Sequence, residues 1–242
     1  MNAPIDFERA RFNMIEQQIR PWDVLDLDVL ELLSLVRREE FVPVAHKALA
    51  FVDMQIPLRS PTEEAMQRGH CMLEPKVEAR MLQDLHVQPH EKVLEVGAGS
   101  GYMAALLSRR AQRVISLELD PELVRMARAN LQRAGITNVE VREADGAKGL
   151  ALEGPFDVIA LSGSVAEVPA ALLSQLKIGG RLAANVGFEP VMRATFITRT
   201  GEASFTTTQP WDTLAPRLAH FPEPSRRATF CTDCAPRARK ND

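Results

Sequence analysis

Apolar and polar residues follow two different periods along the chain. From residue 92 onward, short apolar runs typical of buried strands alternate with runs of helical spacing, and this alternation predicts a parallel sheet with helices on both faces. Strands are predicted over 92–97, 113–119, 138–145, 156–163 and 179–187, and helices over 102–110, 121–135 and 167–176. The pattern therefore predicts an α/β fold with a Rossmann-like sheet.

Two further strand-like runs close the pattern. Residues 191–200 and 203–211 flank Thr200-Gly201-Glu202, a combination that indicates a hairpin turn. With these two runs, the prediction is a seven-stranded, mostly parallel sheet with a C-terminal antiparallel strand.

The first ninety residues are different in kind. Apolar residues recur at helical spacing over 7–19, 26–41 and 75–87, and the intervening segments are rich in Pro and polar residues. We expect an N-terminal helical cap over 1–90, a single α/β domain over 91–230 and a polar tail over 231–242. The tail is predicted to be disordered because it has few apolar residues to bury.

Charge and apolar run lengths narrow the range of partners. The net charge is −3, and Lys, Arg, Asp and Glu are spread along the chain, so no basic block points to nucleic acid or to an anionic membrane surface. The apolar runs are too short to span a bilayer, and the N-terminus lacks the apolar core of a signal peptide. A cytoplasmic location is the expectation, and the oligomeric state is not predicted.

The cysteines and histidines do not predict a metal site. Cys231 and Cys234 form a C-x-x-C pair near the C-terminus, and Cys71 stands alone. A zinc site needs two more ligands at suitable spacing, and the five histidines are scattered. We therefore expect Cys231 and Cys234 to be dispensable for folding and ligand binding.

The first strand of the α/β region ends in a glycine-rich turn. Gly97, Gly99 and Gly101 precede the helix predicted from Tyr102, and such a turn lets a nucleotide approach the backbone at the carboxyl end of a strand. The dinucleotide fingerprint G-x-G-x-x-G requires its third glycine where Tyr102 stands. The spacing therefore favours S-adenosylmethionine over NAD, and an NAD-dependent oxidoreductase is the less favoured alternative.

Glu95, two residues before this turn, supports the same choice. A diphosphate at roughly 6 Å from a carboxylate, in an effective dielectric of about 20, would be repelled by on the order of 3 kcal/mol. S-adenosylmethionine has no phosphate and carries positive charge instead. The alternative interpretation of Glu95 is a structural acid that is hydrogen-bonded within the turn.

Two further acids lie at strand ends. Glu118 comes 21 residues after Gly97, where a carboxylate can accept both ribose hydroxyls, and Asp145 follows the third strand, where it can accept the adenine amino group. Asp-Gly is also an ordinary turn signal, so both interpretations of Asp145 stay open. The predicted cofactor-binding residues are Glu95, Gly97, Gly99, Gly101, Glu118, Leu119, Asp145 and Gly146.

The chain resembles a known family at this point. The segments VLEVGAGSGY, SLELD, READG, FDVIALSG and QLKIGGRLAANVG are similar, in this order, to the motifs of class I S-adenosylmethionine-dependent methyltransferases. Within that class the nearest resemblance is to protein-L-isoaspartate O-methyltransferases, and it rests on VRREEFVP, AFVDMQIPL, GHCMLEPKVEARML and EVPAALLSQL. Together these segments cover nearly the whole chain.

The resemblance implies a repair reaction. Its members transfer a methyl group from S-adenosylmethionine to the free carboxylate of an isoaspartyl residue, and the ester collapses to a succinimide that can reopen as normal aspartate. The implied partner is therefore a protein or peptide that contains isoaspartyl residues. A carboxylate is already a nucleophile, so this reaction depends mainly on alignment of the reactants.

One segment departs from the family pattern. Where the family has Thr-Ile-Ser-x-Pro, this sequence has Cys71-Met72-Leu73-Glu74-Pro75, so a leucine replaces the serine and an acid follows it. On the resemblance alone, we expect weak activity on isoaspartyl peptides and an improvement in the Leu73→Ser variant. The open alternatives are a methyltransferase for another acceptor and a non-catalytic module that binds the cofactor.

The candidates on the substrate side are Leu73, Glu74, Gly163 and Ser164, and no catalytic residue is assigned. The segment 59–68 is longer than the family connection. We expect it to reshape the entrance for the substrate.

Overall fold

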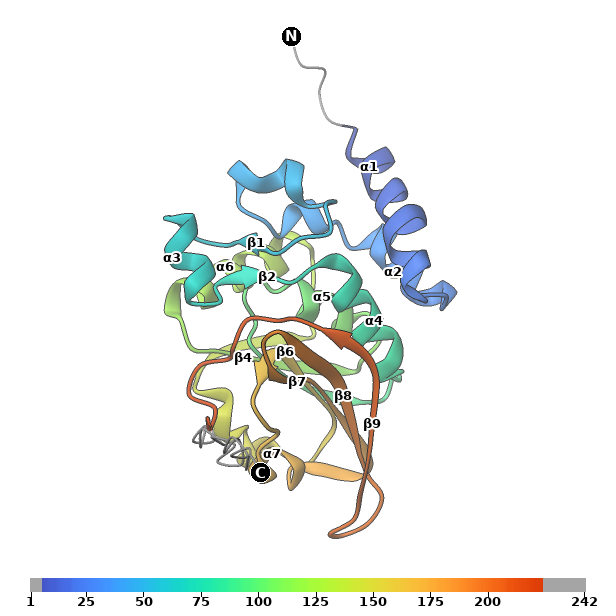
Figure 1. Cartoon of the computed structure of the whole chain (residues 1–242), viewed down its shortest axis with the longest axis vertical. Coiled ribbons are helices and arrows are strands. Elements are labelled where there is room, and N and C mark those ends of the chain that lie inside the picture. The colour runs from blue at the N-terminus through green and yellow to red at the C-terminus, as the bar shows by residue number, and fades with distance from the viewer. Residues whose placement is uncertain (1–5, 224–242) are drawn as a thin grey trace, which may run out of the picture.

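The computed structural model describes residues 6–223, and within them seven strands form the main sheet in the order β5-β4-β3-β6-β7-β8-β9 (Figure 1). The strands are β3 (Lys92–Val96), β4 (Arg113–Glu118), β5 (Val139–Glu143), β6 (Phe156–Val165), β7 (Leu176–Phe188), β8 (Val191–Arg199) and β9 (Phe205–Thr213). Strands β5, β4, β3, β6 and β7 are parallel, while β8 runs antiparallel to both β7 and β9. The predicted mostly parallel seven-stranded sheet is confirmed.

Helices cover the two faces of the sheet. They are α4 (Pro75–Leu85), α5 (Tyr102–Ser108), α6 (Pro121–Arg133) and α7 (Ala170–Leu173). Because alternate strand residues point to opposite faces, Val93 and Val114 join one core with the cap and α4 to α6, whereas Leu94 and Ile115 join a second core beside α7. Both cores are buried, which explains the continuous apolar runs of the parallel strands.

The order of the strands reverses at one point in the sheet, between β3 and β6. From β3 the chain proceeds outward to β4 and β5, then returns across the sheet to β6 on the other side of β3. The carboxyl ends of β3 and β6 therefore flank a point where the strand order reverses. Open α/β sheets bind their ligands at such a point.

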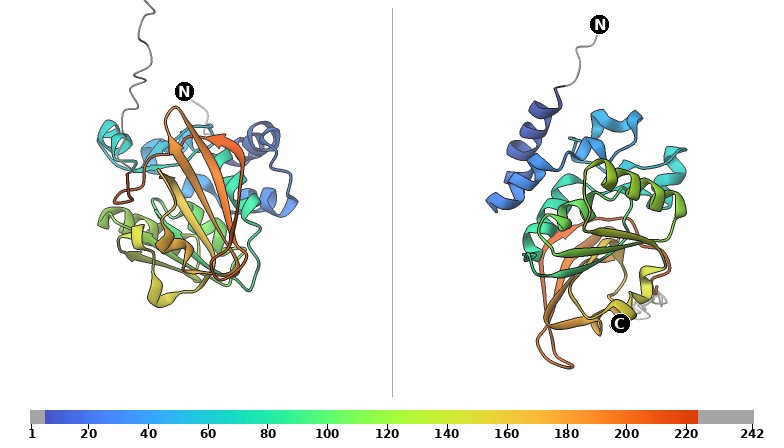
Figure 2. Two further views of the ribbon diagram at one scale, coloured as in Figure 1. Left: turned by 60° about the horizontal axis from the view of Figure 1, so that its bottom comes forward. Right: turned by 180° about the vertical axis from the view of Figure 1, so that it is seen from behind.

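The N-terminal cap lies at one end of the molecule, and the β8–β9 hairpin extends from the other (Figures 1 and 2). The cap consists of α1 (Phe7–Met14), η1 (Ile15–Ile19), η2 (Arg20–Trp22), α2 (Leu27–Leu35), η3 (Arg38–Glu40), η4 (Val44–Leu49), α3 (Thr62–Gln67) and a two-stranded sheet of β1 (Ile56–Pro57) and β2 (Cys71–Met72). Helices precede the sheet as predicted, but the prediction did not include the small sheet, and α4, which it placed in the cap, packs against β7 of the main sheet.

The helix predicted over 26–41 ends early. Helix α2 stops at Leu35 because Val36 is extended, with φ −86° and ψ 98°. This bend carries Arg38 into the interior, where it is fully buried and donates hydrogen bonds to the Glu78 carboxylate and the Leu73 carbonyl. A tertiary ion pair therefore overrides the local helical pattern.

The helix predicted over 167–176 is also shorter than expected. Only Ala170–Leu173 is helical, because Pro169 disfavours a helical conformation in the residue before it. Strand β7 begins at Leu176, which pairs with Phe156, instead of at residue 179. The hairpin predicted at 200–202 is confirmed, with Thr200 N–H donating to Ser204 O at 2.8 Å.

Two further findings concern membrane-spanning helices and the C-terminal residues. None of the helices in residues 6–223 has the length and apolar character that crossing a bilayer requires. The predicted polar tail, with Cys231 and Cys234, lies outside the described residues.

Candidate active site

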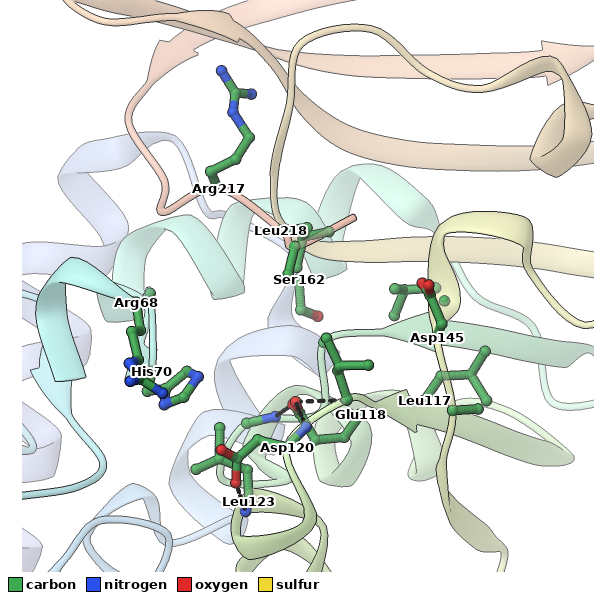
Figure 3. Close-up of a pocket in the computed structure, with 18 of the residues that line it drawn as sticks. Arg68, His70, Leu117, Glu118, Asp120, Leu123, Asp145, Ser162, Arg217 and Leu218 are labelled. Atoms are coloured by element: carbon green, nitrogen blue, oxygen red, sulfur yellow. Dashed lines mark hydrogen bonds between the residues drawn. The ribbon is translucent and has the colours of Figure 1, made fainter. Parts of the chain in front are cut away.

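A cavity of about 310 Å³ lies at the carboxyl ends of β3 and β4 (Figure 3). Its volume is within the range of about 300–1,000 Å³ that is typical of small-molecule sites. The turns after β3, β4 and β5, the end of β6 and a C-terminal segment contribute to its walls, including Gly97, Gly99, Glu118, Leu119, Asp145, Gly146, Ser162 and Leu218. Six of the eight predicted cofactor-binding residues thus line one cavity.

The glycine turn has the geometry that its sequence predicts. Gly97, Gly99 and Gly101 have φ of 94°, 51° and 83°, a region that favours glycine. Gly97 and Gly99 line the cavity. Gly101 instead begins α5, and a side chain there would lie 3.3 Å from Ala127 of α6, so its role is helix packing.

Glu118 is held in place at the cavity wall. Its Oε2 accepts from the Gly99 N–H at 2.9 Å, and its Oε1 accepts from the N–H groups of Leu119 and Asp120 at 2.8 and 3.0 Å. The residue is 9% exposed. A carboxylate offers about four acceptor positions, so Glu118 keeps acceptor capacity toward the cavity.

Asp145 lies across the cavity from Glu118 (Figure 3). Its Oδ1 accepts from the Ala147 N–H at 3.0 Å, and its Oδ2 lies 2.8 Å from His220 Nδ1. Desolvation opposes the ionised carboxyl, but the hydrogen bonds from Ala147 and His220 outweigh it and lower the pKa of Asp145. Close packing requires a glycine at the next position, because a Cβ on Gly146 would lie 2.2 Å from Val96 Cγ1.

Glu95 lies beneath the turn and is not among the residues that line the cavity. It is fully buried and accepts hydrogen bonds from Ser116 Oγ at 2.5 Å and Ser162 Oγ at 2.8 Å. Burial raises its pKa to about 8, although the two hydroxyls favour the ionised form. Glu95 therefore fixes Ser162, which does line the cavity.

A segment after the last strand forms one wall that the sequence analysis did not identify. Residues 214–221, here called the C-terminal strap, cross the end of β6, with the Ser164 N–H donating to Pro216 O and the Leu218 N–H donating to Ser164 O. Leu218 lies over Gly97 and Gly163, where an added Cβ would come within 3.0 and 2.7 Å of Leu218 Cδ2. The available signal was the apolar pair Leu218 and Phe221 after the last strand.

Residues 68–71 line the cavity on the cap side, at and directly after the end of the segment predicted to be longer than the family connection. Arg59 Nη1 lies 2.5 Å from Asp120 Oδ2, and Arg59 also pairs with Glu122, so the segment is joined to the start of α6. Arg68 and His70 line the cavity. Arg68 is the one residue of 59–68 that lines the cavity, and the effect of this segment on the substrate entrance stays a prediction.

Leu73 and Glu74 do not line this cavity. Leu73 is 5% exposed and lies in an apolar cluster with Val77, Ala215 and Trp211. Glu74 Oε1 accepts from Gln55 Nε2 at 3.3 Å, and burial raises the pKa of Glu74. The other two substrate-side candidates, Gly163 and Ser164, are likewise not among the residues that line the cavity, and they lie against the strap.

Residues 6–223 contain no group of three or more His, Cys, Asp or Glu side chains that could hold a metal ion. Cys71 lines the cavity, and burial raises the pKa of its thiol to about 12. The polar lining of the cavity combines three acids, Ser162 and three basic side chains; the acids are Glu118, Asp120 and Asp145, and the basic residues are Arg68, His70 and Arg217.

Comparisons with known proteins show the family of the chain. Residues 10–213 match the family described as protein-L-isoaspartate(D-aspartate) O-methyltransferase (PCMT). A protein-L-isoaspartate O-methyltransferase of Koribacter versatilis is 38% identical over 80% of this chain and 83% of its own, and protein-L-isoaspartate O-methyltransferase 1 of Syntrophobacter fumaroxidans is 40% identical over 76% and 82%.

A solved structure of a Plasmodium falciparum chain assigned to this enzyme class, in complex with S-adenosyl-L-homocysteine, superposes with a TM-score of 0.71. It is 19% identical, and the match covers 89% of this chain and 99% of that one. The two chains share the same fold.

Proposed function

The chain belongs to the protein-L-isoaspartate(D-aspartate) O-methyltransferase family, and from this premise we propose that it methylates the free carboxylate of isoaspartyl residues in damaged proteins. It is an S-adenosylmethionine-dependent methyltransferase, and the open question is which residues of this chain hold the donor and the acceptor. The cavity at the reversal of strand order supports one answer.

The residues of the cavity fit the cofactor. The fixed carboxylate of Glu118 would accept the ribose hydroxyls, and Asp145 would accept the adenine amino group in addition to its contacts with Ala147 and His220. Gly97 and Gly99, which have no side chains, leave the backbone open to the amino-acid end of the cofactor. Glu95 would act indirectly, through the Ser162 that it fixes.

The methyl transfer does not require the protein to donate or accept a proton. As an acceptor carboxylate attacks, the bound cofactor supplies a methyl group from its positively charged sulfur, so a C–O bond forms, the C–S bond breaks and the sulfur keeps the electron pair. No proton moves in this step, and no general base is needed. The residues of the chain must therefore orient the two reactants and exclude water, which is the main source of rate in such reactions.

One observation carries the proposal above the others. Glu118 is tied by three backbone N–H groups to the glycine turn and to the start of α6, which fixes its carboxylate at the cavity wall. This arrangement suits a nucleoside that carries positive charge. A strand-end acid also serves NAD sites, so the choice against NAD rests on the glycine spacing, in which Tyr102 stands where the dinucleotide fingerprint needs its third glycine.

Repair of a peptide tests the proposal. An isoaspartyl peptide should be converted in part to the normal aspartyl peptide during long incubation with the protein and S-adenosylmethionine, and chromatography separates the two forms. Incubation with S-adenosylhomocysteine in place of the donor is the control. Equal amounts of aspartyl peptide in both samples would contradict the proposed function.

A further inference from the structure

Three polar side chains lie side by side where the strap meets the sheet. Ser164 of β6 pairs with Asn185 of β7, and on its other side Ser164 forms a parallel bridge with Arg217 of the strap. Paired residues of neighbouring parallel strands project to the same face. Ser164, Asn185 and Arg217 therefore form a row on one face, here called the polar row.

Each member of the polar row has a buried atom that lacks a hydrogen-bond partner among residues 6–223. These atoms are Ser164 Oγ, Asn185 Oδ1 and Arg217 Nη1. Ser164 and Asn185 are 0% exposed. A buried polar atom without a partner costs about 1–3 kcal/mol, so three such atoms in one row indicate a ligand that would satisfy them.

The other polar atoms of the row are occupied, and they fix its orientation. Asn185 Nδ2 donates to Gly163 O at 3.4 Å. Arg217 Nη2 donates to Gly187 O at 2.9 Å, and Arg217 Nε lies 2.9 Å from a Glu223 carboxylate oxygen. The atoms that remain are two donors, the Ser164 hydroxyl and Arg217 Nη1, and one acceptor, Asn185 Oδ1.

The position of the row suits the acceptor of the methyl group. The row lies at the carboxyl end of β6 and beside the end of β7, where open α/β sheets bind ligands. Ser162, Arg217 and Leu218 line the cavity from this side, and Figure 3 shows the Arg217 side chain pointing away from Glu118. The nucleoside and the polar row would therefore occupy opposite ends of one site.

We propose that the polar row binds the α-carbon groups of the isoaspartyl residue, an inference that rests on the proposed function. Ser164 and Arg217 donate to the free carboxylate of the isoaspartyl residue, and Asn185 Oδ1 accepts from the backbone N–H of that same isoaspartyl residue. In an isoaspartyl residue the free carboxylate and the N–H are attached to the same carbon. In a normal aspartyl residue a methylene separates them, so this spacing distinguishes the two.

The strap closes the row in this structure, so the acceptor must displace part of it. Two backbone hydrogen bonds hold the strap to Ser164, and the Leu218 side chain lies against Gly163. Gly163 has no Cβ, which leaves space on the path from the row to the cavity once Leu218 moves. The row also gives the chain donors for the carboxylate that do not involve position 73.

Steady-state kinetics of single variants test the inference. Ser164→Ala and Arg217→Gln should each raise KM for an isoaspartyl peptide about ten-fold or more, because each removes a hydrogen bond to a charged group. The dissociation constant of S-adenosylhomocysteine, measured by calorimetry, should stay unchanged. Ser174→Ala and Arg193→Gln are matched controls, since both residues lie on the surface away from the cavity.

Two features keep the test decisive. Ser164→Ala removes a buried hydroxyl without a partner, so this variant should fold at least as stably as the wild type. Asn185→Asp keeps the acceptor oxygen but adds a negative charge, and it should raise KM by more than Asn185→Ser does. If the wild type turns over the peptide and KM is unchanged in Ser164→Ala and Arg217→Gln, the proposed role of the polar row is wrong, whereas the proposed function stands. Absence of wild-type turnover would instead contradict the proposed function.

Discussion

The Glu118 carboxylate accepts a hydrogen bond from the Gly99 N–H, with 2.9 Å between Oε2 and the nitrogen. This bond joins the end of β4 to the turn after β3, two structures that would contact different parts of a bound nucleoside. Hydrogen bonds within the protein thus hold the proposed site for the methyl donor in place, and a preorganised site loses less free energy on binding.

Replacement of Glu118 should therefore weaken cofactor binding. Glu118→Ala removes the acceptor of the ribose hydroxyls, and because hydrogen bonds to charged groups contribute about 1.5–3 kcal/mol each, we expect the dissociation constant of S-adenosylhomocysteine to rise ten-fold or more. Glu143→Ala is the matched control, because Glu143 is an exposed acid at the end of β5. Calorimetric titration of both variants, checked for folding by circular dichroism, makes the comparison, and an unchanged constant for folded Glu118→Ala would remove Glu118 from the site.

The buried carboxyl of Glu95 should make stability depend on pH. The pKa of Glu95 is about 8 in the folded protein, compared with an ordinary value of 4.5 for a glutamate. Between these two pH values the folded state keeps a proton that the unfolded state releases. The stabilising contribution is complete below about pH 4.5 and is lost as the pH rises through 8. The slope for one proton is at most about 1.4 kcal/mol per pH unit.

Glu95→Gln removes this proton, and its amide can still accept from one of the hydroxyls of Ser116 and Ser162 and donate to the other. We expect the free energy of unfolding of the variant to fall less than that of the wild type between pH 5.5 and 7.5. Burial also raises the pKa of Glu78, to about 7, so the difference between the two proteins is the informative quantity. Urea denaturation at the two pH values measures it, and parallel pH dependences would show that Glu95 does not carry the effect.

Packing at position 73 reverses the expectation that the resemblance suggests. Leu73 lies against Val77, Ala215 and Trp211, so Leu73→Ser should lower the free energy of unfolding by about 2–5 kcal/mol, the range for loss of a buried leucine side chain. It should not raise the rate on isoaspartyl peptides. Leu152→Ser is the control, because Leu152 is 101% exposed. A stable Leu73→Ser variant with a several-fold higher rate would show that this position faces the acceptor.

The sequence predicted the parts of the fold that depend on local pattern. The strands of the sheet, the glycine turn and the strand-end acids Glu118 and Asp145 follow from short-range period and spacing, and they meet in one cavity because carboxyl ends of parallel strands share an edge. The reasons for two glycines were different from those inferred. Gly101 and Gly146 make room for Ala127 and Val96, contacts between residues distant in sequence.

Features that depend on long-range contacts could not be predicted from the pattern. The early end of α2 results from the pairing of buried Arg38 with Glu78, forty residues away. The strap contacts β6 through Ser164 and Pro216, which lie 52 positions apart in the numbering. Periodicity carries no information about such pairings, so the wall that the strap forms became visible only in the structure.

Transfer of a labelled methyl group tests the central claim most directly. The wild-type protein is incubated with methyl-labelled S-adenosylmethionine and with one of two peptides that have the same composition and differ only in an isoaspartyl or a normal aspartyl residue. We predict base-labile methyl ester on the isoaspartyl peptide and none above background on the aspartyl peptide. Equal labelling of both peptides, or no labelling of either by a protein that binds S-adenosylhomocysteine, would contradict the account.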